Sequence, residues 1–264
     1  MTAVDGVSAL SVRGLRKAFG GVLAIDDVSF DVPAGTLTAL IGPNGAGKST
    51  LFNLLTNLYR SDTGAVSFFG TSLAGRSSDA IARLGLVRTF QTARVFPGMT
   101  VLENVLAGLH VTARAPVWSH ALTLGVARRE ERSMRRRAEA LLDAVGIGGL
   151  RDADAIALPL GSQKVVELAR ALIARPRVLL LDEPAAGLND AETEQLAQLL
   201  VSIHASGTTV FVVEHNMSLV MGIADRVLVL DAGRLIATGS PQEIQANSAV
   251  IEAYVGRGAE AAAS

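Results

Sequence analysis

The segment from Ile41 to Thr50 combines three glycines with a lysine and two hydroxyl side chains, a combination that could bind an anion. It fits the phosphate-binding pattern G-x-x-x-x-G-K-S/T, in which the glycines let successive backbone N–H groups point at one ligand. Lys48 would bridge the β- and γ-phosphates of a nucleotide, and the Ser49 hydroxyl would bind Mg²⁺. A helix that begins near Ser49 would direct the positive end of its dipole at the phosphates. The predicted nucleotide-binding residues are Gly42, Pro43, Asn44, Gly45, Ala46, Gly47, Lys48, Ser49 and Thr50.

An acidic pair, Asp182 and Glu183, follows four consecutive large apolar residues at positions 178–181. Such an apolar run is typical of a strand buried on both faces in the middle of a parallel sheet. Two carboxylates at the end of that strand are costly unless they meet a cation. Asp182 would hold Mg²⁺, directly or through water, and Glu183 would polarise a water for in-line attack on the γ-phosphate. The alternative is an acidic pair that only faces solvent, which the phosphate-binding pattern upstream disfavours.

Three further residues could take part in the same chemistry. Phe19 lies in the turn between two strands upstream of the phosphate loop, where it could stack on a base or be an ordinary core residue. Gln91 ends a strand at residues 86–90, and its amide could reach Mg²⁺ or the attacking water. His215 follows a buried strand at residues 207–214, and ligands of open α/β sheets bind at the carboxyl ends of such strands.

The elements that would position these residues alternate along the chain. A buried strand at residues 36–41 precedes the phosphate loop and a helix follows it, an order that disfavours a chance glycine-rich turn. Apolar residues change to helical spacing between residues 99 and 147, which predicts a helical insert in an α/β protein. The other predicted elements are an antiparallel β element at 9–33, a short strand at 64–70, a helix at 80–83, an amphipathic helix starting at Gly161 and Ser162, a hairpin at 226–238 around Ala232-Gly233, and a helix at 241–254 before a disordered tail at 256–264.

The composition describes a folded globular protein without a strong net charge. Its 264 residues are 49% hydrophobic and 19% charged, enough for one large α/β domain or two modest ones. With 24 basic and 25 acidic residues, the chain has almost no net charge, so its overall charge does not attract it to nucleic acid or anionic lipid. The absence of cysteine excludes disulfides and thiolate chemistry. No signal peptide or apolar run of about 20 residues is present, so any work at a membrane would go through partners.

Two unusual segments lie inside the helical insert. The arginine-rich run at residues 128–137 could suggest a site for RNA or lipid phosphate, but its interleaved glutamates and apolar stripe favour a solvated helix face. Residues 115–127 carry no charge and are too few to cross a bilayer. We therefore expect no membrane span here and assign no role to this charge-free stretch.

The order of these motifs resembles that of the ATP-binding subunit of an ABC transporter, over nearly the whole chain. The resemblance implies a P-loop ABC ATPase cassette with ATP and Mg²⁺: a RecA-like, mainly parallel core with an antiparallel β element (1–92 and 158–240), a helical subdomain (93–157), and a C-terminal helix and tail (241–264). It also implies these roles: Phe19 stacks on adenine, Gln91 and Asp182 reach the metal, Glu183 is the catalytic carboxylate, His215 is the switch histidine, and residues 158–163 and 186–189 are the signature and D-loop segments.

Within that family, four segments are similar to the LivG-type subunit of branched-chain amino acid importers: residues 87–91, 182–189, 213–215 and 250–256. Importers of urea and short-chain amides share much of this pattern. The implied partners are a second nucleotide-binding subunit, two membrane permease subunits and, indirectly, an extracytoplasmic substrate-binding protein, with no nucleic acid. The implied location is the cytoplasmic face of the membrane. A non-transport ABC ATPase and a regulatory module without turnover are the alternatives.

The signature segment departs from the family pattern Leu-Ser-Gly-Gly-Gln. Gly161 keeps that pattern and would face the ATP of the opposite subunit together with Ser162, which stands in the glutamine position. Pro159 occupies the serine position and offers neither a hydroxyl nor an N–H. Asn189 replaces the usual acid of the D-loop. We therefore expect a complete phosphate-binding side and a weakened signature side, as in a heterodimer of paired subunits.

Overall fold

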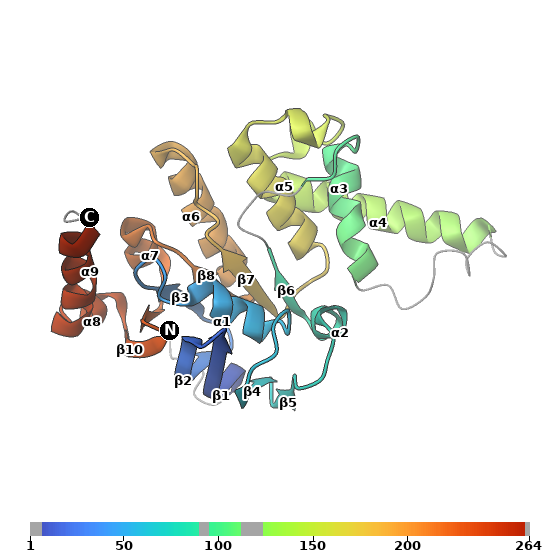
Figure 1. Ribbon diagram of the computed structural model, residues 1–264. Coiled ribbons are helices and arrows are strands. Elements are labelled where there is room, and N and C mark those ends of the chain that lie inside the picture. Colours follow the sequence, from blue (N-terminus) through green and yellow to red (C-terminus); the bar gives the residue numbers. More distant parts are fainter. Residues whose placement is uncertain (1–6, 90–94, 112–123, 262–264) are drawn as a thin grey trace.

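The computed structural model describes residues 7–89, 95–111 and 124–261 (Figure 1). Its centre is a six-stranded sheet in the order β10-β9-β3-β8-β7-β6. Strands β9, β3, β8, β7 and β6 run parallel to one another. Strands β9 and β10 form the predicted antiparallel hairpin. The strands are β3 (Leu37–Ile41), β6 (Leu86–Arg88), β7 (Val178–Asp182), β8 (Thr209–Val213), β9 (Arg226–Asp231) and β10 (Arg234–Gly239). Every residue of β3, β7 and β8 is buried, as expected for central parallel strands covered on both faces.

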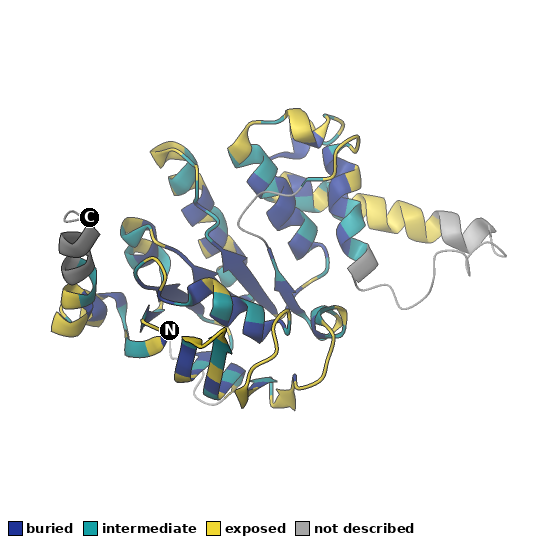
Figure 2. Ribbon diagram, viewed as in Figure 1, coloured by how far each residue is buried: buried dark blue, intermediate teal, exposed yellow. Residues whose placement is uncertain are grey.

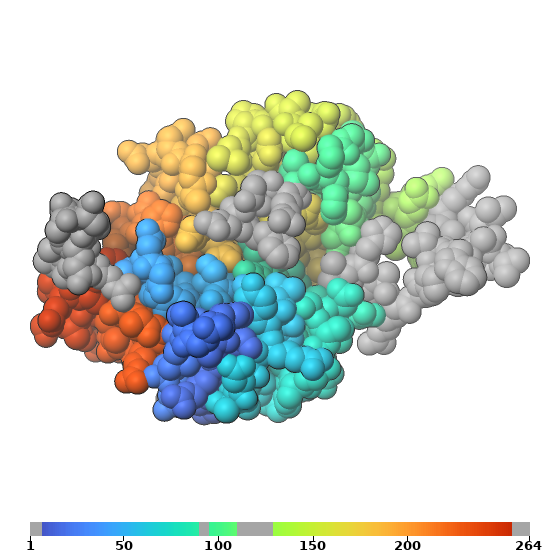
Figure 3. Space-filling model, viewed as in Figure 1, coloured from blue at the N-terminus to red at the C-terminus, as the bar shows by residue number. Residues whose placement is uncertain are grey.

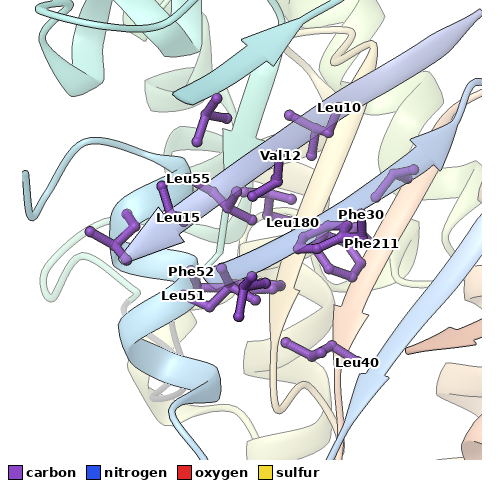
Figure 4. Close-up of a cluster of buried hydrophobic side chains, with 14 of the residues drawn as sticks. Leu10, Val12, Leu15, Phe30, Leu40, Leu51, Phe52, Leu55, Leu180 and Phe211 are labelled. Carbon is purple, nitrogen blue, oxygen red and sulfur yellow. The ribbon is translucent and has the colours of Figure 1, made fainter. Parts of the chain in front are cut away.

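A second, antiparallel sheet covers one face of the first. Its order is β2-β1-β4-β5, with β1 (Ser8–Phe19), β2 (Val22–Pro33), β4 (Thr63–Phe68) and β5 (Thr71–Ser72). Helix α1 (Lys48–Leu55) lies between the two sheets, where Phe52 contacts Phe211 of β8 at a ring-centroid distance of 5.2 Å (Figure 4). Phe30 of β2 reaches the same ring at 5.8 Å. The helix that follows the phosphate loop is therefore fixed from both sides.

The opposite face of the parallel sheet is covered by α6 (Asp190–Ala205) and α7 (Met217–Ile223). Successive side chains of one strand point to opposite faces of the sheet, as the two-residue period of a strand requires. Leu180 packs in the cluster with α1, whereas Leu179 and Leu181 pack in the cluster with α6 and α7. The carboxyl ends of the parallel strands are thus held rigidly where the predicted site residues lie.

A group of helices lies beside the sheet and has its own apolar core (Figures 1 and 2). It consists of α3 (Val101–Ala107), η1 (Gly108–Val111), α4 (Leu124–Ala144), η3 (Gly148–Leu150), η4 (Ala155–Ala157) and α5 (Leu160–Leu172). Helix α2 (Ser78–Arg83) precedes β6. Helix α4 projects from the rest of the molecule (Figure 3), and residues 129–136 on it are exposed. Residues 129–136 of the arginine-rich run are therefore a solvated helix face, as predicted, whereas Arg137 at its end is partly buried. Among the described residues, no helix has the length and apolar character needed to cross a membrane.

The C-terminal segment differs from the single helix predicted at residues 241–254. The structure has two helices, α8 (Pro241–Gln245) and α9 (Ser248–Ala261). Ser240 and Glu243 form a capping box that starts α8, and the Asn247 side chain accepts from the backbone N–H of Ala249, 3.0 Å away, at the start of α9. Helix α9 also continues beyond the predicted start of a disordered tail at residue 256, although Gly256 and Gly258 have low helix propensity.

Candidate nucleotide-binding site

The phosphate loop connects β3 to α1, and two of its glycines are required by close backbone contacts. A Cβ added to Gly42 (φ 155°) would lie 2.0 Å from the carbonyl oxygen of Leu230 in β9. A Cβ on Gly47 (φ 103°) would lie 2.5 Å from the carbonyl oxygen of Ala24. The first N–H groups of α1 have no intrahelical partners, as at every helix N-terminus, and they follow directly after this loop. The loop is shaped to bind an anion.

Lys48 is the positive charge of this loop. It is 6% exposed, and its Nζ donates to the carbonyl oxygens of Gly42 and Pro43 at 2.7 and 3.0 Å. Burial lowers the pKa of Lys48, while the nearby charges of Glu183 and then Asp182 act in the opposite direction. The lysine and the acidic pair therefore lie on the same side of the sheet, as the sequence predicts.

The strand register explains this proximity. Asp182 of β7 is aligned with Val213 of β8, and Val213 is aligned with Leu40 of β3. Asp182 and the start of the phosphate loop thus end their strands at the same level, although β8 separates them. Because the carboxyl ends of parallel strands share one edge, the two motifs meet there.

Asp182 is 5% exposed and forms a buried ion pair. Its Oδ2 accepts from Nη2 of Arg88 in β6 at 2.6 Å, and Nη1 of Arg88 also donates to Oδ1 of Asn53 in α1 at 2.7 Å. The described residues contain no group of three His, Cys, Asp or Glu side chains that could hold a metal by themselves. Mg²⁺ that binds together with a nucleotide takes one or two protein ligands and several phosphate oxygens. Ser49 and Asp182 are of the right type for those ligands.

Glu183 has an unusual backbone conformation, with φ at 48°. A residue other than glycine pays about 1–3 kcal/mol for such a conformation, which persists only where the surroundings enforce it. The Glu183 N–H donates to the carbonyl oxygen of Val213 at 2.9 Å. Its Oε2 lies 3.9 Å from Nδ1 of His215, whose side chain is 58% exposed. The predicted catalytic carboxylate and the switch histidine are therefore neighbours.

A pocket of about 540 Å³ lies between the phosphate loop and Glu183. It is lined by phosphate-loop residues including Lys48 and Ser49, by Glu183, by residues 22–24 of β2, and by Ala232 and Gly233 of the β9–β10 turn. The turn is tied to the loop, since the Gly233 N–H donates to the carbonyl oxygen of Ala46 at 3.0 Å. This volume is typical of a small-ligand site.

Among the described residues, Phe19, Gly161 and Ser162 do not line this pocket, and neither do Gly42, Pro43, Asp182 and His215. Phe19 ends β1, is 42% exposed, and meets Tyr59 edge to face at 5.3 Å between ring centroids. Gly161 and Ser162 form the first turn of α5, where Gly161 approaches Glu192 of α6. The helix begins one residue earlier than predicted, at Leu160. Gln91 lies outside the described residues.

Comparison with known proteins decides the family. A sequence model described as ABC transporter matches residues 25–186, more than half of the chain. The chain belongs to the ABC transporter family. A second model, described as branched-chain amino acid ATP-binding cassette transporter, matches residues 234–260. The membership confirms the predicted fold class and the ATPase activity coupled to transport.

Relatives within the ABC family cover nearly the whole chain. LivG of Salmonella typhimurium, a high-affinity branched-chain amino acid transport ATP-binding protein, is 41% identical over 94% of this chain and 97% of its own. BraF of Pseudomonas aeruginosa, described in the same words, is 40% identical with the same coverage. The crystal structure of an ABC transporter cassette in its ADP conformation has a TM-score of 0.83 at 32% identity, covering 95% of this chain and 100% of that one.

Three charged residues of this ABC cassette contact the site or its supporting backbone and were not among the predicted site residues. Arg88 pairs with Asp182, Lys164 of α5 donates to the carbonyl oxygen of Pro184 at 2.8 Å, and Glu214 accepts from the N–H of Ala185 at 2.7 Å. Each is a charged residue in a segment otherwise dominated by apolar residues. That pattern is the sequence signal that could have identified them, because buried charges are rare without a partner.

Proposed function

We propose that the chain is the ATP-hydrolysing subunit of an importer for branched-chain amino acids. The likeness to LivG and BraF carries this proposal, because it extends over 94% of the chain. The match at residues 234–260 adds support, since those residues lie outside the general ABC transporter match. The pocket that contains Lys48 and Glu183 supplies the groups that ATP hydrolysis needs.

In the proposed mechanism, the loop at residues 42–50 holds the phosphates of ATP and Lys48 neutralises their charge. Mg²⁺, held by Ser49, Asp182 and Gln91, would stabilise the charge on the phosphates. Glu183 accepts a proton from the attacking water, and His215, within 3.9 Å of that carboxylate, orients the reacting groups. Phe19 stacks on the adenine. No covalent intermediate with the protein is needed, so positioning and electrostatics provide the catalysis.

The proposed assembly contains two nucleotide-binding subunits and two membrane permease subunits at the cytoplasmic face, with an extracytoplasmic binding protein delivering the substrate. Gly161 and Ser162 would contact the ATP of the second subunit from the first turn of α5. Pro159, the N-cap of α5, makes no side-chain capping bond. Because proline offers neither a hydroxyl nor an N–H to a phosphate, the residue supports a weakened signature side. The proposed pair of nucleotide-binding subunits is a heterodimer. The helical part at residues 93–157 would face the permease.

Reconstitution tests the proposal. The chain, co-purified with the second nucleotide-binding subunit and the permease subunits and placed in vesicles that are supplied with the substrate-binding protein, should drive ATP-dependent uptake of leucine. Glu183→Gln should keep nucleotide binding but stop hydrolysis and uptake. Uptake of urea without leucine would contradict the proposed substrate class, and hydrolysis at the normal rate in the glutamine variant would remove Glu183 from its catalytic role.

A further inference from the structure

The peptide bond that follows the catalytic carboxylate by one residue is held at both of its polar atoms. The carbonyl oxygen of Pro184 accepts from Nζ of Lys164 at 2.8 Å. The N–H of Ala185, which belongs to the same peptide group, donates to Oε1 of Glu214 at 2.7 Å. Lys164 of α5 and Glu214, which follows β8, thus fix the orientation of one peptide plane, which is separated from Glu183 by the Glu183–Pro184 peptide.

Both charged groups are buried. Lys164 is 9% exposed and Glu214 is fully buried. The other oxygen of Glu214 accepts from the N–H groups of His215 and Asn216 at 3.1 and 3.4 Å. Burial lowers the pKa of Lys164, and the charges of Glu214, Glu167 and Glu183 oppose this shift. A buried charge is tolerated only when hydrogen bonds replace its hydration, so each group depends strongly on these contacts.

The Lys164 contact joins two parts of the fold. Helix α5 contributes Val166 and Ala169 to the apolar core of the helical group, whereas Pro184 and Ala185 connect β7 to α6 at the sheet. Between them lies a cavity of about 20 Å³, lined by Lys164 and Pro184 among others. The lysine therefore forms a polar contact across a seam that is not fully packed. A shift of α5 relative to the sheet would act on the Pro184 carbonyl through this bond.

We propose that Lys164 is a positioning residue for hydrolysis: together with Glu214 it clamps the Pro184–Ala185 peptide, holds Glu183 in its left-handed conformation, and links the position of α5 to the catalytic carboxylate. The left-handed φ of 48° at Glu183 needs such enforcement, because the residue has a Cβ. The inference rests on the proposed function, since it assumes that Glu183 acts on the attacking water.

Replacing Lys164 tests the clamp in the assembled complex. Lys164→Met keeps the length of the side chain but removes the donor. Loss of a hydrogen bond from a charged group should lower kcat for ATP about 10- to 100-fold. The KM for ATP and the affinity for a fluorescent ATP analogue should change less than about threefold, because the phosphate loop is intact. Lys164→Arg should recover most of the turnover. If the methionine variant does not fold, Lys164→Gln, which is too short to reach Pro184, replaces it.

Arg137→Met is the matched control. Arg137 also donates to a backbone carbonyl of α5's end, that of Ile173, with Nη2 2.6 Å from the oxygen, and burial lowers its pKa as it does for Lys164. Ile173 follows the last residue of α5, nine residues after Lys164, or about 14 Å along the helix. The control should lower the melting temperature without changing kcat. An equal loss of kcat in both variants would overturn the inference, because it would show a general effect of loosening α5.

A double-mutant cycle separates the clamp from the catalytic assignment. If Lys164 acts through Glu183, adding Lys164→Met to Glu183→Gln should slow the residual turnover by less than about twofold. A further loss equal to that in the wild-type background would overturn the clamp. Stalled hydrolysis in Glu183→Gln with normal turnover in Lys164→Met defeats this inference alone. Normal turnover in Glu183→Gln defeats the proposed function itself.

Discussion

Arg88→Met should destabilise the nucleotide-free chain by about 3 kcal/mol, the lower end of the range for removing one partner of a buried ion pair. The side chains of Arg88 and Asp182 are only 9% and 7% exposed, and their atoms lie 2.6 Å apart. Without the guanidinium, the carboxylate of Asp182 is left buried without its cation. The methionine keeps an apolar contact with Phe52, over which the guanidinium now lies at 5.6 Å. Only the charge and its hydrogen bonds are removed.

Thermal denaturation measures this effect. A loss of 3 kcal/mol should lower the melting temperature by roughly 6–12 °C in a chain of this size. Mg-ATP should raise the melting temperature of the variant more than that of the wild type, because Mg²⁺ would supply part of the missing positive charge at Asp182. The readout is therefore the difference between melting with and without Mg-ATP.

Arg135→Met is the control, since it breaks an exposed pair with Glu139 one turn along α4, where the arginine side chain is 57% exposed. Such a pair contributes about 0.3–0.5 kcal/mol, so the control should melt within about 2 °C of the wild type. If Arg88→Met melts like the control, the buried pair does not stabilise the fold as argued. If it is destabilised but gains no more from Mg-ATP than the wild type, Arg88 and the metal do not act on the same carboxylate.

Three further predictions concern the loop, the β element and the signature helix. Gly42→Ala should abolish nucleotide binding, measured by titration with a fluorescent ATP analogue, because its Cβ would lie 2.0 Å from the Leu230 carbonyl oxygen; wild-type affinity would contradict this. Hydrogen bonds from Arg16 and then Arg234 lower the pKa of Asp26 below its ordinary value of 3.8. The stability that the Asp26 carboxylate contributes is therefore present above pH 3.8 and lost as the pH falls through the folded-state pKa. Asp26→Asn should therefore lower the melting temperature at pH 7 and have a smaller effect at pH 3, and an equal difference at both would refute the assignment. Pro159→Ser should raise the ATPase rate of the assembled complex severalfold, and an unchanged rate would count against a weakened signature side.

The elements that depend on local pattern could be predicted from the sequence. The phosphate loop, the buried strand before Asp182 and the hairpin around Ala232-Gly233 each follow from periodicity and turn residues within a short segment. The end of the chain was less predictable. The single helix predicted at residues 241–254 is two helices, α8 and α9, because Asn247 caps the start of the second one.

The contacts that join distant segments were decided by the tertiary structure. Arg88 and Asp182 are 94 residues apart, and Lys164 reaches Pro184 across a boundary between a helix and a sheet. Nothing in the spacing of these residues indicates their partners, because strand order and register bring them together. The sequence by itself determined which chemical groups the site contains, since glycines, a lysine and carboxylates at fixed spacing allow few other uses. Only the folded chain decided which buried charge neutralises which, because that depends on the alignment of β7 with β8 and β3 and on the position of α5.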